Sequence, residues 1–214
     1  MKFSIEELRP TRNGMTISRD SKLGNSTKVT YFFMGKDTSI SQESYDRMTM
    51  YIGASGWGEF IIGEEPEIIK LQPDELLIVP AGTLCGMQTS NGIVYTEIIC
   101  TGKDINMNAN VKTNEVFALK NLISYEEGSI ANMDVVSTPD MKYVLMAFDE
   151  GTGLTPHRAP GNAIVFALEG KATIGYEGKD YELSEGECFR FEKNGLHSVT
   201  ANGKFKMALL LVLE

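Results

Sequence analysis

Two histidines, His157 and His197, are the only imidazole side chains in the chain and the residues best suited to chemistry. Imidazole titrates near neutral pH, so it can act as a general acid or base, and its neutral form binds transition metals. Two imidazoles alone bind a metal weakly, because catalytic zinc sites supply three protein ligands and iron facial triads add a carboxylate. A metal at this pair therefore needs a further donor, for which Asn162 or a glutamate is the candidate.

The three cysteines, Cys85, Cys100 and Cys188, are odd in number and lie far apart in the sequence. This spacing fits neither a disulfide framework nor a CxxC motif, so we expect three reduced thiols. The first ten residues, MKFSIEELRP, carry two glutamates and an arginine. A secretory signal needs an apolar run of about 7 to 15 residues at that point, so we expect a cytoplasmic protein.

The chain is acidic: among its 214 residues, 29 Asp and Glu outnumber 20 Lys and Arg, giving a formal net charge of −9. This balance disfavours nucleic acid and anionic membrane surfaces as partners. The most apolar run, Met207–Leu213, is far shorter than the roughly 20 residues that span a bilayer, and it is typical of a buried strand. We therefore expect a globular protein with no nucleic-acid partner and no membrane span.

Short β-rich runs recur between glycine-containing turns, which indicates an all-β sandwich or barrel. Helical periodicity is scarce, and only Ile5–Leu8 and Val116–Ser124 are candidates for a short turn or helix. The expected strands are Val29–Met34, Met48–Ile52, Glu75–Val79, Ile93–Cys100, Tyr143–Phe148, Ala163–Leu168, Cys188–Phe191 and Lys206–Leu213.

The sequence also repeats itself once. An offset of 114 residues superposes Phe3 on Phe117 and Gly56 on Gly170, and after a two-residue contraction an offset of 112 superposes Leu71 on Leu183. Because apolar runs fall on apolar runs over about 85 residues, we infer an internal duplication. It predicts two domains, residues 1–103 and 104–214, joined by a polar linker at about 103–115.

The second half resembles the cupin family in two motifs, Gly151–Gly170 and Leu183–Val199. His157 stands at a histidine position of the first cupin motif, and His197 stands at the histidine of the second. In the first half, Leu71–Met87 has the shape of the second motif. The resemblance implies an all-β bicupin: two tandem jelly-roll barrels of the double-stranded β-helix type, the N-terminal one degenerate.

In a metal-dependent cupin the resemblance implies three imidazoles and one carboxylate around the metal. Here the two further positions of the C-terminal set hold Ala159 and Ala163, and in the first half the four positions hold Glu43, Tyr45, Thr49 and Cys85. One divalent ion (Zn, Fe, Mn or Ni) at His157 and His197 is therefore one interpretation. The others are that the two histidines bind a ligand or water by hydrogen bonds, or that they act in metal-free acid–base chemistry.

Two sets of residues are the candidates for a ligand pocket. His157, His197, Asn162, Tyr176 and Phe191 belong to the C-terminal barrel, and Glu43, Tyr45 and Cys85 to the N-terminal barrel. Cys85 is typical of a small buried hydrophobe, because a reactive thiol needs a nearby cation. Arg158 and Arg190 are suited to an anionic ligand, although exposed strand positions explain them as well.

Fold alone does not determine function in a superfold of this kind. We expect a protein that binds a small molecule in a pocket of the C-terminal barrel, with an incomplete set of metal ligands. The alternative is a metal-dependent enzyme of dioxygenase, isomerase or decarboxylase type, acting through His157 and His197 on a small polar or acidic metabolite. A structural protein is the third possibility, and we expect a homodimer, the commonest oligomer.

Overall fold

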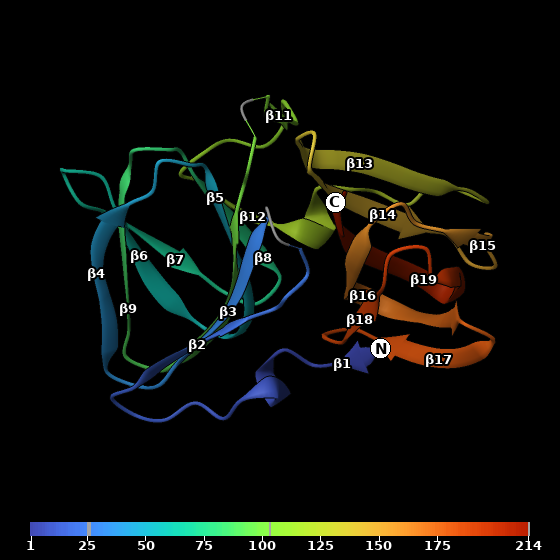
Figure 1. The fold of residues 1–214 in the computed structure, drawn as a ribbon, viewed down its shortest axis with the longest axis horizontal. Coiled ribbons are helices and arrows are strands. Elements are labelled where there is room, and N and C mark those ends of the chain that lie inside the picture. Colours follow the sequence, from blue (N-terminus) through green and yellow to red (C-terminus); the bar gives the residue numbers. More distant parts are fainter. Residues whose placement is uncertain (25–26, 103, 214) are drawn as a thin grey trace. The chain divides into compact units, whose positions relative to one another are not determined.

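The computed structural model describes residues 1–24, 27–102 and 104–213, and Figure 1 shows that strands joined by loops are their main regular structure. Within these ranges there are nineteen strands and two three-residue 3-10 helices, η1 (Glu6–Leu8) and η2 (Leu119–Asn121), and no α-helix. The prediction of an all-β fold is confirmed. No helix in the described ranges has the length and apolar character needed to cross a membrane.

The chain divides into two compact units. The first unit comprises Ile5–Thr101 and Ala109–Ala118, and the second comprises Met1–Ser4, Gly102–Asn108 and Leu119–Glu214. Each unit therefore contains a short piece of the opposite half of the sequence. In the first unit this piece includes strand β12 (Val116–Ala118), and in the second it includes β1 (Lys2–Phe3).

Two antiparallel sheets make up the first unit. The six-stranded sheet has the order β12-β8-β5-β10-β3-β2, and the four-stranded sheet has the order β4-β9-β6-β7. The further bounds are β2 (Thr16–Asp20), β3 (Lys28–Met34), β4 (Thr38–Ser44), β5 (Thr49–Gly56), β6 (Gly58–Ile62), β7 (Glu67–Leu71), β8 (Glu75–Val79), β9 (Leu84–Thr89) and β10 (Ile93–Ile99).

Strand β10 lies between β3 and β5 and sets which side chains face the interior of the first unit. Tyr95 is paired with Phe32, and Glu97 is paired with Tyr51 on the other side. Directly paired residues share one face of a sheet, and residues two apart on a strand share it too. All four side chains therefore point to the same face, which carries the apolar core of this unit.

The second unit is one nine-stranded sheet with the order β1-β18-β16-β19-β14-β13-β11, in which β15 pairs with β19 and β17 with β16. Its core contains four fully buried phenylalanines. The strands are β11 (Asn106–Met107), β13 (Ile130–Ser137), β14 (Met141–Phe148), β15 (Gly153–Arg158), β16 (Asn162–Tyr176), β17 (Lys179–Ser184), β18 (Cys188–Phe191) and β19 (Leu196–Val212). The phenylalanines are Phe148, Phe189, Phe191 and Phe205.

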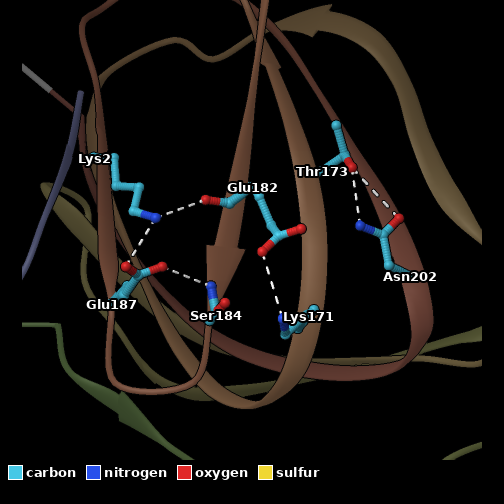
Figure 2. A network of polar contacts seen from close by, with 7 residues as sticks. All are labelled: Lys2, Lys171, Thr173, Glu182, Ser184, Glu187 and Asn202. Atoms are coloured by element: carbon cyan, nitrogen blue, oxygen red, sulfur yellow. Dashed lines mark hydrogen bonds and ion pairs between the residues drawn. The ribbon is translucent and has the colours of Figure 1, made fainter.

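Polar contacts around Lys2 hold β1 in the second unit (Figure 2). The Lys2 ammonium lies 2.8 Å from a carboxylate oxygen of Glu187 and donates to the Glu182 carbonyl at 3.0 Å, and the Ser184 N–H donates to Glu187 at 2.9 Å. Burial opposes ionisation of Glu187, yet the two hydrogen bonds and the Lys2 charge together hold its pKa below the usual value. The ion pair between Lys2 and Glu187 thus reinforces the two-residue strand β1.

Each of the eight strands expected from the sequence overlaps a strand of the structure, and the bounds of β8 and β18 are the same as predicted. The two candidate helical segments contain the 3-10 helices η1 and η2, and Val116–Ser124 begins with strand β12. Val116 pairs with Leu77 in that strand, so tertiary pairing decides its conformation.

Candidate functional site

Equivalent strand pairs in the two units bring the candidate residues together. Glu43 on β4 is paired with Cys85 on β9, and His157 on β15 is paired with His197 on β19. In both pairs the register shifts just before the candidate residue, after Ile40 in one and after Leu154 in the other. The repeat offsets of 114 and 112 therefore relate two structurally matching sites, each next to a β-bulge.

The two imidazoles of the second unit lie against each other. Their ring centroids are 4.2 Å apart, and their planes are inclined by 52°. The Nδ1 atom of His157 lies 2.8 Å from the Thr155 carbonyl, and that of His197 lies 2.9 Å from the Gly195 carbonyl. Because a carbonyl only accepts, each Nδ1 carries the hydrogen and each Nε2 keeps a lone pair.

The two histidines differ in environment. His157 is exposed, whereas His197 is only 7% exposed. Burial lowers the pKa of His197, the Gly195 carbonyl opposes that shift, and the neighbouring His157 adds to it. Burial thus favours the neutral form of His197, in which Nε2 is an acceptor.

Aromatic side chains pack around His197. Phe191 stacks on its ring at 4.2 Å between centroids, and Tyr176 meets Phe191 edge-on at 5.6 Å. The Asn162 side-chain oxygen accepts the Lys193 N–H at 2.8 Å, so that oxygen already has a donor from the loop that follows β18. The structure thus brings together four of the five residues expected in the C-terminal pocket.

Both arginines near this site have partners within the protein. Arg158 donates to the Asn194 carbonyl and lies 3.8 Å from a Glu177 carboxylate oxygen. Arg190 lies 2.8 Å from a carboxylate oxygen of Glu192. These contacts are those of surface ion pairs, which carry little energy and need no ligand to explain them.

The donor set of the second unit is smaller than a resident metal ion requires. In residues 1–24, 27–102 and 104–213, no three His, Cys, Asp or Glu side chains gather as metal ligands would. Two imidazole nitrogens are available, whereas a catalytic zinc site uses three protein ligands. The described residues therefore do not by themselves fit the metal that the family's motifs imply.

The first unit contains a cavity of about 180 Å³ between its two sheets. The three candidates Glu43, Tyr45 and Cys85 all line it. The other lining residues are Phe32, Ile40, Ser41, Tyr51, Phe60, Gly86, Met87, Tyr95 and Glu97. The side chains at the first unit's candidate positions thus share a space that is large enough for a ligand of about the size of benzene.

Glu97 is the most unusual group in this cavity. A glutamate carboxyl is ordinarily ionised at neutral pH, and yet this residue is only 4% exposed. Burial raises its pKa to about 7, and the Lys28 charge and a hydrogen bond from Tyr45 oppose that rise, while Glu43 adds to it. At neutral pH Glu97 therefore exists in both protonation states, which suits it to donate or accept a hydrogen bond.

The Cys85 thiol and the Tyr45 hydroxyl, which lie near Glu97, are neutral at physiological pH. Burial raises the pKa of the Cys85 thiol to about 11, although a hydrogen bond with Tyr51 opposes the shift. Burial and the nearby carboxylates raise the pKa of Tyr45 to about 12. Cys85 is therefore a thiol, which supports its interpretation as a small apolar side chain.

Four aromatic rings form one wall of the cavity. Phe32 and Tyr95 are stacked, with centroids 4.9 Å apart and planes 1° from parallel. Tyr51 and Phe60 are 4.7 Å apart, and both meet Tyr95 at larger angles, at 6.0 and 5.9 Å. The ring contacts fix these side chains in place, so the wall is preorganised for a ligand.

Comparison with known proteins accounts for the matching sites. Residues 144–213 match the cupin domain family. The structure of a cupin 2 conserved barrel domain protein from Leptotrichia buccalis is similar over 99% of this chain and 96% of its own, with a TM-score of 0.87 and 24% sequence identity. The chain carries a cupin domain at residues 144–213 and has the two-barrel cupin fold. The prediction of two tandem cupin barrels is thereby confirmed.

The bicupin is also similar to more distant solved structures. Salicylate 1,2-dioxygenase from Pseudoaminobacter salicylatoxidans, solved as adducts with gentisate, matches 96% of this chain and 76% of its own, with a TM-score of 0.67 and 11% identity. Another structure of a salicylate 1,2-dioxygenase, from Pseudaminobacter salicylatoxidans, matches 87% and 71%, with a TM-score of 0.64 and 10% identity. No curated protein sequence matches the chain. At such identities the likeness shows the fold alone.

Several cavity residues of the bicupin were missed in the sequence, above all Glu97, Tyr51 and Tyr95. Glu97 did leave a signal, because it is the one charged residue in the apolar run Ile93–Cys100. Alternation places it on the same face as Tyr95, two residues earlier. A charged side chain on the inward face of a buried strand is a candidate functional residue.

Proposed function

We propose that this bicupin binds a small molecule and that its principal binding site is the cavity of the first unit. The observation that carries the proposal is a buried glutamate, Glu97, whose raised pKa lies near neutrality, in a cavity with aromatic walls. Such a combination of shape, few polar groups and a perturbed carboxyl is typical of binding and active sites. The proposal thus places the main site with Glu43, Tyr45 and Cys85.

The C-terminal pocket remains part of the proposal in a secondary role. The interior of the second unit is packed with buried phenylalanines, and Phe191 covers one face of His197. The His157 ring is exposed, and both Nε2 atoms can accept a hydrogen bond. This arrangement supports a surface subsite at the two histidines, where a ligand donates to imidazole.

A cavity-filling substitution tests the location of the principal site. Fragment-sized molecules that bind the wild-type bicupin, detected by ligand-observed NMR, should lose binding in Cys85→Phe, because the added ring occupies the cavity. Ile68→Phe introduces the same ring at an exposed position on β7 and should leave binding unchanged. Binding that survives Cys85→Phe would place the site elsewhere, and a panel with no binders would reject the proposal.

A metal-dependent enzyme is the second candidate function. One feature favours it: each histidine donates its Nδ1 hydrogen to a backbone carbonyl, which is how metal-binding imidazoles are commonly oriented. The number of donors opposes it, since Ala159 and Ala163 stand where further ligands would be. An external ligand would have to complete the set.

Metal analysis separates the two candidates. Protein purified without chelators or an affinity tag should carry a near-stoichiometric transition metal if the second candidate is right, and His157→Ala should abolish it. Glu43→Gln, at the equivalent position of the first unit, is the control and should retain the metal. Wild-type protein that is free of metal and still binds fragments would leave small-molecule binding as the function.

A further inference from the structure

We propose that the cavity of the first unit selects a positively charged ligand with a single ring, such as an aromatic or heteroaromatic ammonium compound, over a carboxylate of the same size. The inference rests on the proposed function, that this cavity binds a small molecule, and adds the chemical class of the ligand. Charge, ring geometry and volume each support it.

The charge of the lining has one sign. Among the described lining residues the acidic side chains are Glu43 and Glu97, and none is Lys, Arg or His. Lys28 is close enough to influence Glu97, but it is exposed at the start of β3 and does not line the cavity. A carboxylate ligand would lose its hydration beside two acidic groups without gaining a cationic partner, which disfavours it.

The aromatic wall attracts a cation independently of the two carboxyls. A cation within about 6 Å of a ring centroid is attracted by the negative face of the ring, and the attraction grows when water is excluded. The rings of Phe32, Tyr51, Phe60 and Tyr95 are 4.7 to 6.0 Å apart in the measured pairs, so a ligand at this wall meets more than one ring. Aromatic rings and a carboxyl together therefore favour an ammonium group.

The volume limits the ligand to about one ring. The cavity has about 180 Å³, and an engineered apolar cavity of about 150 Å³ is known to hold benzene. A six-membered ring with one small substituent therefore fits inside it. The Thr30 hydroxyl is buried without a hydrogen-bond partner in the described structure, and Thr30 is paired with Glu97 on the same face.

Cation binding should be coupled to proton release. A positive charge beside Glu97 favours its ionised form, so binding near neutral pH should drive a proton from that carboxyl. The groups around Glu97 that bear on this are Lys28 on β3, Tyr45 and Glu43 near β4, Tyr51 on β5, Cys85 on β9 and Tyr95 on β10. The tyrosines and the thiol stay neutral at this pH, so Glu97 is the group that titrates.

Isothermal titration calorimetry with three probes of one size tests the inference. Benzylammonium, benzyl alcohol and benzoate share a ring and differ in charge. We expect benzylammonium to bind about tenfold tighter than benzyl alcohol, which corresponds to about 1.4 kcal/mol, and benzoate to bind most weakly. Affinity for 1-methylpyridinium, whose charge is fixed, should rise between pH 6 and pH 8, with proton release shown by different heats in two buffers.

Substitutions assign the selectivity to the carboxyls. Glu97→Gln should lower affinity for benzylammonium about tenfold, abolish proton release and leave affinity for benzyl alcohol unchanged. Glu43→Gln keeps the buried carboxyl and should cause a smaller loss, so it provides the test if Glu97→Gln does not fold. Glu64→Gln, an exposed control in the β6–β7 turn, should behave as wild type.

The possible results separate this inference from the proposed function. Benzoate binding as tightly as benzylammonium would overturn the inference and leave small-molecule binding in place. Failure of all three probes, with fragments still bound in the cavity, would do the same. Binding of benzylammonium with wild-type affinity by both Glu97→Gln and Glu43→Gln would also overturn the inference. A wild-type protein that binds no small molecule at all would reject the proposed function itself.

Discussion

Burial of the Glu97 carboxyl should make the stability of the first unit depend on pH. Its pKa is raised from 4.5 to about 7 in the folded protein, so the folded state binds more protons than the unfolded state between these values. The free energy of unfolding should therefore fall as pH rises from 4.5 to 7 and change little from this group outside that window.

Glu97→Gln removes this titration and keeps the size of the side chain. The difference in the free energy of unfolding between the variant and wild type should therefore grow in favour of the variant by about 3 kcal/mol from pH 4.5 to pH 8. This order-of-magnitude value follows from the size of the pKa shift. Urea unfolding at several pH values measures this difference, with Glu64→Gln as the exposed control. A difference that is constant with pH would show that Glu97 has an ordinary pKa.

At the same scale, the sequence pointed to some residues of the candidate sites and missed others for a physical reason. Glu43, Tyr45, Cys85, His157 and His197 were found because motif spacing and the repeat offsets depend only on order along the chain. Phe32 and Tyr95 lie far apart in the sequence, and their rings stack with centroids 4.9 Å apart only after folding. Single-sequence periodicity contains no information on such contacts between distant strands.

At the level of elements, Gly86 permits β9 to pass close to the bulge in β4. A Cβ at this position would lie 3.0 Å from the Gln42 nitrogen and the Ile40 carbonyl oxygen, both backbone atoms. Gly86→Ala should therefore push the strands apart and destabilise the protein by about 1 to 3 kcal/mol in urea unfolding. It should also weaken fragment binding, since Gly86 lines the cavity.

The matched control for Gly86→Ala lies in the other unit. Ser198 occupies the equivalent position by the offset of 112, and it is opposed by a glycine, Gly175. Ser198→Ala creates the same residue without new bulk, so its effect should stay within about 0.5 kcal/mol. Equal effects of the two substitutions would contradict the close approach described for Gly86.

The strands themselves were the most predictable part of the fold. A continuous apolar run such as Leu76–Val79 in β8 can be identified without knowledge of its partner strands, because such a composition indicates burial on both faces of the sheet. The strand β4, with alternating half-buried and exposed residues, was missed, as was β7. The sequence of β4 is too polar to differ from a loop, and its pairing with β9 makes it a strand. Strand β7 is short and carries charged residues, and it pairs with β6.

At the scale of the whole molecule, strand β12 should determine where the chain can be divided. Residues 1–118 contain all strands of the first unit, whereas residues 1–102 lack β12, which pairs with Glu75, Leu76 and Leu77. The longer fragment should be more stable by about 2 kcal/mol or more, because it covers the edge of β8 and two fully buried leucines. Urea unfolding of both fragments, followed by circular dichroism, measures the difference.

Equal stability of the two fragments would mean that β12 adds nothing to the first unit, and the boundary at 103/104 expected from the sequence would then be a sufficient division. That boundary follows from the internal duplication inferred from the sequence repeat. The exchanged strands β1 and β12 are equivalent by the repeat, since Lys2 pairs with Phe189 as Val116 pairs with Leu77, but each strand pairs with the opposite half of the sequence. For this reason the repeat alone does not predict the composition of each compact unit.

Strand β1 has a consequence for the order in which the protein can be completed during synthesis. Lys2 and Phe3 are synthesised long before their partners Phe189 and Cys188. At about 5 to 20 residues per second, β1 waits roughly 10 to 40 s for these partners. The strand therefore acquires its native pairing only after the ribosome has translated β18.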